Sequence, residues 1–241
     1  MSAIEGLQAS MLDRTTAVPD QKIIFVLGAL GAGKGTLCGK LVEQFDYCHI
    51  SLGDHLRALC NPDSGYPIEA LGGLPLGRLQ ADIKGRKVLE AGPILGILKY
   101  RIEQEKKNGR QTFVINGFPR ADNSAVEFEA EVGKPTMVLV FDCARETAKA
   151  RFLARKREAG DNSEMFARRY AEFERNDQMS VDRYGQLVKW VSKILERQGK
   201  RIRLIGLWVD TSRSIDGSYK SLIECLGRKE LRRECAMLTM V

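Results

Sequence analysis

Long hydrophobic runs are missing from this sequence. No uninterrupted apolar run is longer than that of residues 23–27, whereas a helix that crosses a membrane needs about 20 mostly apolar residues. The first twenty residues contain Glu5, Asp13 and Asp20 but only one arginine, and this charge balance indicates neither a secretory nor an organellar signal. We therefore expect a cytoplasmic protein that binds no membrane.

Cysteine pairs at metal-binding spacing are also missing. The chain has six cysteines and two histidines. No two cysteines form a C-x-x-C pair, and no histidine accompanies them at the spacing of a zinc site; they are Cys38, Cys48, Cys60, Cys143, Cys225 and Cys235. We expect reduced thiols in the cytosol and no zinc ion.

Aromatic residues are few, at 7% of the chain, and an excess of basic residues gives a formal net charge of +7. A positive balance indicates anionic partners. It fits a nucleic-acid-binding protein, and it fits equally an enzyme that binds several phosphate groups. Because no motif combines aromatic with basic residues, we expect no nucleic-acid partner.

Short apolar segments alternate with segments of helical periodicity along most of the chain. Residues 22–27, KIIFVL, are typical of a buried parallel strand. Further strands are predicted at 48–52, 112–116, 136–141 and 202–209, with helices at 34–45 and at about 93–107, 144–157, 163–179 and 181–197. The alternation predicts an α/β fold in which helices cover both faces of a parallel sheet.

A glycine-rich stretch, GALGAGKGTL, occupies residues 28–37 between the first strand and the first helix. It departs from the common phosphate-loop pattern G-x-x-x-x-G-K-[ST], because Gly35 stands at the hydroxyl position and Thr36 follows it. Glycines let the backbone fold around an anion and direct N–H groups toward it, and Lys34 adds a positive charge for the terminal phosphates. Strand, glycine loop and helix, in that order, predict a phosphate site.

Two segments interrupt the alternation. Residues 60–90 are rich in glycine and proline and indicate an excursion from the sheet, and residues 157–162, REAGDN, separate two charged helices. Residues 1–21 form an N-terminal extension, and residues 227–241 form a basic and then apolar tail without an assigned role.

Several motifs together resemble adenylate kinases and related nucleoside monophosphate kinases. The loop reads G-x-x-G-x-G-K-G-T; HISLGDHLR is similar to the family's S-x-G-D-x-L-R segment, and FVINGFPR is similar to its D-G-F-P-R motif with asparagine in place of aspartate. VLVFDCARETAKARFLARK resembles the fourth strand and the helix before the lid. VDTSRSIDGSY matches the final strand and a loop that lies beside the nucleotide base in this family. The resemblance covers residues 22–226 and implies a P-loop kinase core, a monophosphate-binding insertion at 52–90 and a short lid at 157–162.

The resemblance also implies a reaction and a set of site residues. The reaction is Mg²⁺-dependent transfer of the γ-phosphoryl group of ATP to a nucleoside monophosphate, most often AMP, by a monomer. Positioned arginines suit this chemistry because their planar forks bind phosphate oxygens and stay charged. Catalytic roles carry over to Lys34, Arg120, Arg151, Arg155 and Arg169. ATP binding carries over to Gly31, Ala32, Gly33, Lys34, Gly35, Thr36, Arg151 and Arg155. Monophosphate binding carries over to Ser51, Arg57, Gly117, Arg120, Ser124 and Arg169, and Mg²⁺ binding to Thr36, Asp54 and, through water, Asn116.

Among the positions that depart from the family's pattern, three concern the acceptor base or Mg²⁺. At the acceptor-base positions, Leu52 stands where the family often has threonine or alanine, and Ser124 where it often has glutamine or asparagine. Serine offers one short hydroxyl in place of an amide with a donor and an acceptor. Asn116 lacks the negative charge that aspartate would place beside Mg²⁺. Because VFDC and the short lid resemble UMP-CMP kinases, UMP and CMP are alternative acceptors. A catalytically weak nucleotide-binding scaffold or sensor is a further hypothesis.

Overall fold

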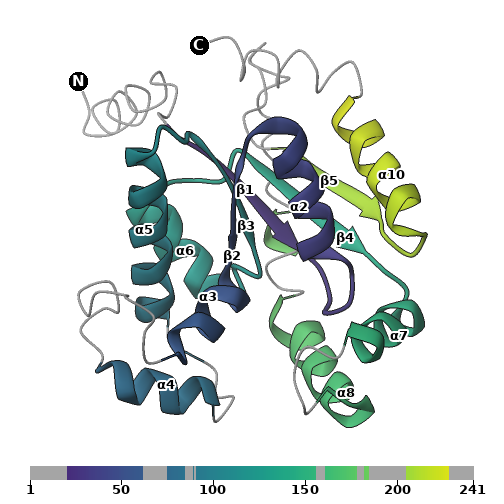
Figure 1. Ribbon diagram of the computed structural model, residues 1–241, viewed down its shortest axis with the longest axis horizontal. Helices are drawn as coiled ribbons and strands as arrows, with labels where there is room; N and C mark the ends of the chain where they lie inside the picture. Colours follow the sequence, from purple (N-terminus) through teal and green to yellow (C-terminus); the bar gives the residue numbers. More distant parts are fainter. Residues whose placement is uncertain are drawn as a thin grey trace, which may run out of the picture.

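A five-stranded parallel sheet lies at the centre of the computed structural model, which describes residues 21–61, 75–84, 89, 91–155, 161–177, 182–184 and 205–227 (Figure 1). The strands are β1 (Lys22–Leu27), β2 (Cys48–Ser51), β3 (Thr112–Asn116), β4 (Met137–Asp142) and β5 (Ile205–Asp210). Their order in the sheet is β2-β3-β1-β4-β5, and every pairing is parallel. The α/β fold class predicted from the sequence is confirmed.

The central strand β1 has both faces buried. Ile23, Phe25 and Leu27 belong to one hydrophobic core, whereas Ile24 and Val26 belong to the other. Successive side chains of a strand point to opposite faces, so a strand with a core on each side is apolar throughout. This burial explains the uninterrupted apolar run with which the sheet begins.

Helices cover both faces of the sheet (Figure 1). The core that contains Phe25 includes side chains from α3 (Leu52–Leu59), α5 (Ala91–Lys107) and α6 (Asp122–Glu131). The opposite core includes side chains from α2 (Lys34–Phe45), α7 (Arg145–Arg155), α8 (Ser163–Glu172) and α10 (Ile215–Gly227). A smaller cluster of Leu59, Leu79 and Ile97 joins α4 (Leu76–Lys84) to α3 and α5.

The sequence pattern does not predict α3, α4, α6 and α10. Only Ser124, Ala125 and Phe128 of α6 are buried, so its apolar periodicity is weak. α10 begins after Ser214, whose Oγ accepts a hydrogen bond from the N–H of Gly217 at 3.2 Å and thus caps the helix. The helix predicted at 163–179 is α8 followed by the π-helix η2 (Phe173–Asp177). The helix predicted at 181–197 lies outside the described residues except for 182–184, as do most of the lid and both terminal segments.

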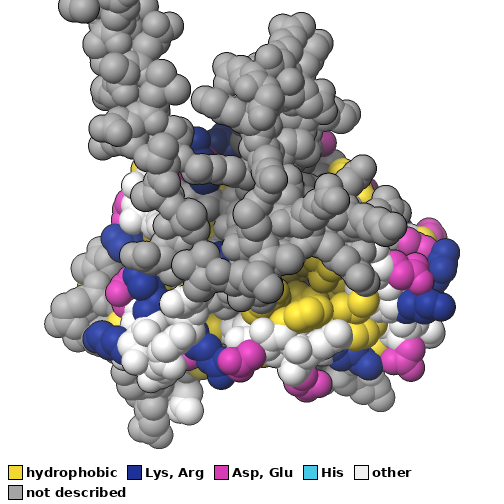
Figure 2. Space-filling view, turned by 90° about the horizontal axis from the view of Figure 1, so that it is seen from above, with side chains coloured by type: hydrophobic (Ala, Val, Ile, Leu, Met, Phe, Trp, Pro, Cys, Tyr) yellow, Lys and Arg dark blue, Asp and Glu magenta, His cyan; other side chains and the backbone are white. Residues whose placement is uncertain are grey.

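Acidic and basic side chains are interspersed on the visible part of the face shown in Figure 2. The exposed large hydrophobic side chains among the described residues come from four different elements; they are Phe45, Val126, Trp208 and Ile215. Across the described ranges, every helix is too short or too polar to traverse a lipid bilayer.

Candidate active site

Three segments with predicted site residues begin at the carboxyl edge of the sheet. Parallel strands end at a common edge, and open α/β sheets bind ligands outside it. The P-loop (residues 28–33) follows β1, and α3 follows β2. Residues 117–121 follow β3 and are called the acceptor loop here because they contain Gly117 and Arg120, which are predicted to bind the acceptor. Asn116 at the end of β3 pairs with Val26 of β1 on one side and with Ser51 of β2 on the other. α3 and α4 flank this edge on one side, and α7 and α8 on the other (Figure 1).

The P-loop follows a backbone path that glycine permits. Gly31 and Gly33 have φ angles of +81° and +82°, which residues with a Cβ rarely adopt. Gly33 precedes the first residue of α2, so the first N–H groups of that helix lie next to the loop. A tight turn that leads into a helix N-terminus favours a bound anion.

Packing imposes a second requirement on Gly31. A Cβ at this position would lie 2.1 Å from the carbonyl oxygen of Ala148 in α7. At Gly33 the nearest atom to a Cβ would be Leu37 Cδ1, at 3.9 Å. The P-loop therefore packs directly against the backbone of α7, the helix that carries Arg151 and Arg155.

Lys34 lies over the P-loop from the first position of α2. Its Nζ donates to the carbonyl oxygen of Gly28 at 2.6 Å and to that of Ala29 at 2.8 Å. Ala32 is fully buried. Gly35 and Thr36 follow in the first turn of α2, where Thr36 is exposed. The structure thus brings the predicted ATP-binding residues of the loop together at one helix N-terminus.

The start of α3 supplies another part of the site. Ser51 caps this helix, because its Oγ accepts a hydrogen bond from the N–H of Asp54 at 3.4 Å. Arg57 forms an ion pair with Asp54 one turn earlier, and both side chains are partly exposed. Leu52 is fully buried in the core. This predicted acceptor-base position therefore presents no side-chain surface to a base.

The acceptor loop positions Arg120 at the same edge. Arg120 Nε donates to the carbonyl oxygen of Gly117 at 3.0 Å, and this hydrogen bond holds the guanidinium group beside the turn. Ser124 is only 6% exposed, and its hydroxyl donates to the carbonyl oxygen of Ala121 at 2.8 Å. The hydroxyl at this second predicted acceptor-base position therefore already has a hydrogen-bond acceptor at the start of α6.

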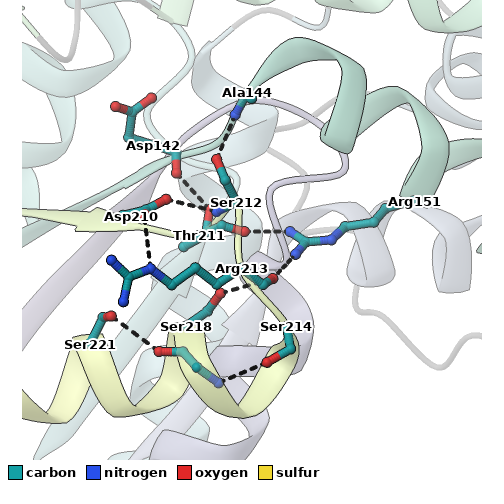
Figure 3. A network of polar contacts seen from close by, with 11 residues as sticks. Asp142, Ala144, Arg151, Asp210, Thr211, Ser212, Arg213, Ser214, Ser218 and Ser221 are labelled. Carbon is teal, nitrogen blue, oxygen red and sulfur yellow. Dashed lines mark hydrogen bonds and ion pairs between the residues drawn. The ribbon is translucent and has the colours of Figure 1, made fainter.

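Arg151 joins α7 to the loop between β5 and α10 (Figure 3). Its Nη1 donates to the carbonyl oxygen of Thr211 at 2.5 Å, and its Nη2 donates to that of Arg213. Thr211 in turn donates through both its N–H and its Oγ1 to the carbonyl oxygen of Asp142, at 2.7 Å and 2.9 Å. Arg151 therefore fixes the loop that the family resemblance assigns to the nucleotide base.

Sequence reasoning did not single out the residues that close this loop. Ser212 Oγ accepts a hydrogen bond from the N–H of Ala144 at 2.9 Å, and Arg213 Nε lies 3.2 Å from Asp210 Oδ2 (Figure 3). The available signal was the run TSRS directly after the last strand, since hydroxyl side chains at such positions favour turns and caps.

Arg155 lies at the end of α7, where the predicted lid begins. Its Nε is 3.3 Å from Asp161 Oδ2, and its guanidinium lies 4.3 Å from the ring centroid of Phe152. The Asp161 side chain is only 1% exposed. Arg169 is partly buried on α8, which begins after Asn162. The ion pair connects the end of α7 to the predicted lid, two residues before α8 begins.

The predicted Mg²⁺ donors come from three elements of the same edge: Thr36, Asp54 and Asn116. Asn116 is 8% exposed at the end of β3. Within the described segments, His, Cys, Asp and Glu form no group of three or more that suits a metal ion. Mg²⁺ usually keeps several waters and binds one or two protein oxygens together with substrate phosphates. The donor set therefore fits an ion delivered with a nucleotide.

Burial keeps the histidines near this edge uncharged. Burial lowers the pKa of His49 and of His55 below the ordinary value of 6.5. Burial also raises the pKa of Cys38 in α2 to about 12, so its thiol stays protonated. Neither kind of group is needed for phosphoryl transfer, which depends on positioning and charge.

Known proteins resemble this chain over most of its length. The family model described as adenylate kinase matches residues 26–189. Adenylate kinase 1 of Drosophila melanogaster is 32% identical over 188 residues, which are 76% of this chain and 77% of the relative. Uridylate kinase of Saccharomyces cerevisiae is 30% identical over 212 residues, 86% of this chain and 92% of the relative. UMP-CMP kinase of Lentinula edodes is 34% identical over 173 residues, 69% of this chain and 75% of the relative.

Proposed function

We propose that this chain, which belongs to the adenylate kinase family and is a nucleoside monophosphate kinase, transfers the γ-phosphoryl group of ATP to AMP. The reaction would produce ADP from both substrates. The observation that supports it most directly is the P-loop at the N-terminus of α2, with Lys34 Nζ bonded at 2.6 Å to Gly28. AMP is supported by the family match and by relatives that carry the name adenylate kinase.

On this proposal, the P-loop and α2 bind the β- and γ-phosphates of ATP. Phosphate oxygens would replace the carbonyl oxygens of Gly28 and Ala29 as partners of the Lys34 ammonium. An oxygen of the acceptor phosphate attacks the γ-phosphorus while the bond to the β,γ-bridging oxygen breaks. Lys34 and the positioned arginines would neutralise the charge on the transferring group, which is the main contribution a protein makes to this reaction.

Arg57 and Arg120 would hold the acceptor phosphate on the opposite side of the transferring group. Both belong to elements that start at the carboxyl ends of neighbouring strands, β2 and β3. Arg151, Arg155 and Arg169 would serve the ATP side and the transferring group, with Arg155 leaving Asp161 for phosphate when the lid closes. Lid closure would exclude water as a competing acceptor.

Mg²⁺, bound with ATP, would supply additional charge neutralisation at the phosphates. Thr36 and Asp54 provide oxygens for its coordination shell, and Asn116 would contact it through water. This arrangement uses few protein ligands, as is usual for Mg²⁺.

UMP or CMP is a second candidate acceptor. The yeast relative named uridylate kinase aligns over 92% of its length. In addition, Leu52 is fully buried and the Ser124 hydroxyl is bonded to Ala121 at 2.8 Å, so neither position presents a free polar group that would select adenine.

A coupled assay of ADP formation, with Mg-ATP and AMP, UMP, CMP, GMP or dTMP in turn, tests the proposal. We expect the highest kcat/KM with AMP. Lys34→Ala is the control, because it should abolish turnover while leaving the fold intact, as judged by circular dichroism. A higher kcat/KM with UMP or CMP would show that this pyrimidine nucleotide, and not AMP, is the acceptor. Binding of ATP without turnover on any acceptor would favour the nucleotide-binding scaffold.

We also propose a monomeric, cytoplasmic protein without a nucleic-acid partner. Sedimentation tests the monomeric state, imaging tests the compartment, and a binding assay tests the absence of a nucleic-acid partner.

A further inference from the structure

Arg183 joins two acidic residues on one face of α6. Its Nη1 lies 3.0 Å from Asp122 Oδ1, and its Nη2 lies 3.5 Å from Glu129 Oε2. Seven residues separate the two carboxylates, which is two helical turns. The Arg183 side chain is 25% exposed and that of Glu129 is 12% exposed. A single guanidinium thus spans α6 from its first turn to its third.

The residue after Arg183 anchors this segment in the core. Tyr184 is 1% exposed, and its hydroxyl donates to Glu129 Oε1 at 2.9 Å. Its ring centroid lies 5.8 Å from that of Phe25 on β1. Phe25 also contacts Phe118 of the acceptor loop, with centroids 5.7 Å apart. Residues 183 and 184 are therefore held against the strand that leads into the P-loop and against α6.

The first turn of α6 adjoins the acceptor loop. Asp122 is the first residue of the helix, two positions after Arg120, and Ala121 at the N-cap provides no side-chain hydrogen bond to the helix. A helix start without a capping side chain is weakly held by its own backbone. The ion pair between Arg183 and Asp122 supplies an external attachment at this point.

We propose that Arg183 is a positioning residue that acts through Asp122 to hold Arg120 in place for the acceptor phosphate. This inference rests on the proposed function of Arg120. Because residue 183 follows α8 along the chain, the contact also links the polypeptide beyond the lid to the acceptor loop. Small displacements of a positioned group reduce binding and rate strongly in phosphoryl transfer.

The exposure of the pair separates positioning from general stabilisation. Asp122 is 44% exposed, and partly exposed ion pairs contribute little to folding stability. Glu129 and Tyr184 are far more buried and are the partners expected to stabilise the fold. Loss of the contact at Asp122 should therefore affect acceptor binding more than the unfolding midpoint.

Steady-state kinetics of Arg183→Met, Asp122→Asn and the double variant test this inference. We expect each single variant to raise the KM for the acceptor about 3- to 10-fold and to leave the KM for ATP nearly unchanged. The double variant should raise the acceptor KM no further, because both changes remove the same contact, the one between Arg183 and Asp122. Arg183→Lys should restore part of the acceptor affinity, since it keeps a positive charge near Asp122.

Lys99→Met is the matched control. It removes another ion pair to α6, between Lys99 Nζ and Glu131 Oε2 at 2.8 Å, but at the end of the helix away from Arg120. Its acceptor KM should equal that of the parent. Equal acceptor KM values in the parent, Arg183→Met and Asp122→Asn would overturn the inference, and so would equal increases for ATP and acceptor.

The outcome can be separated from a failure of the proposed function. If the parent shows no turnover with any monophosphate, the proposed function fails, and calorimetric binding of AMP to parent and variants still measures the effect of Arg183. If Arg183→Met does not fold, Asp122→Asn and Arg183→Lys provide the same comparison. If the parent is active and these variants bind AMP with the affinity of the parent, the role of Arg183 is refuted and the proposed function stands.

Discussion

Alanine substitutions at two neighbouring P-loop glycines should differ in effect, although their backbone conformations are nearly the same. Gly31 and Gly33 have φ angles of +81° and +82°, so the conformational cost of adding a Cβ is similar at both positions. The surroundings differ, because the Cβ would lie 2.1 Å from the Ala148 carbonyl oxygen at Gly31 and 3.9 Å from Leu37 Cδ1 at Gly33. Gly33→Ala is therefore an internal control for Gly31→Ala.

The size of each effect follows from these contacts. A left-handed conformation costs a residue with a Cβ about 1–2 kcal/mol, and this is the whole expected effect of Gly33→Ala. The overlap with a backbone atom, which cannot move as a side chain can, should add about 1–3 kcal/mol at Gly31. For a domain of this size, about 1 kcal/mol shifts the unfolding midpoint by roughly 2–4 °C. Gly31→Ala should therefore unfold about 2–12 °C below Gly33→Ala.

Thermal unfolding of the nucleotide-free proteins, followed by circular dichroism, measures this difference without any contribution from bound phosphate. The ATP affinity of each variant would then show whether displacement of the loop from α7 also weakens the phosphate site. Identical unfolding midpoints for Gly31→Ala and Gly33→Ala would refute the reasoning, since close packing against Ala148 would then have no energetic consequence.

Three further predictions concern the carboxyl edge of the sheet. Arg120→Ala should lower kcat/KM for the acceptor roughly 30- to 1000-fold, because losing a charge-assisted partner in such a site costs about 2–4 kcal/mol; a loss confined to ATP affinity would contradict its placement. Asn116→Asp restores a negative charge and should raise the rate about tenfold and lower the Mg²⁺ concentration for half-maximal rate; an unchanged Mg²⁺ titration would show that the charge is not needed. Burial lowers the pKa of His49 below 6.5 in the folded protein. Below pH 6.5 the unfolded chain therefore binds a proton at this histidine more readily than the folded protein does. The stability that depends on a neutral His49 is complete above pH 6.5 and is lost as the pH falls through the lower pKa of the folded state. His49→Asn should therefore lose less thermal stability than the parent between about pH 7.5 and pH 5.5, and a parallel loss would contradict this assignment.

Local sequence determines a large part of this protein. The run KIIFVL specifies a strand buried on both faces, because a polar residue on either face would enter a core. The glycines of the P-loop and the adjacent Lys34 predict a phosphate site, since backbone conformation and charge are properties of those residues themselves. The alternation of such segments is enough to predict a parallel α/β fold, and the motif order is enough to indicate the family.

Contacts between distant segments were decided only by the tertiary structure. Gly31 needs to be glycine partly because α7 packs against it, and no pattern near residue 31 indicates that contact. α6 has too few buried residues for its periodicity to predict it, and its first residue, Asp122, pairs with Arg183, 61 residues further along the chain. Arg151 likewise bonds to a loop 60 residues further along. Such partners lie far apart in the chain and become neighbours only when the sheet order β2-β3-β1-β4-β5 is formed. Hydrogen bonds and steric exclusion act over distances of a few ångströms in space, so they leave no signal along the sequence.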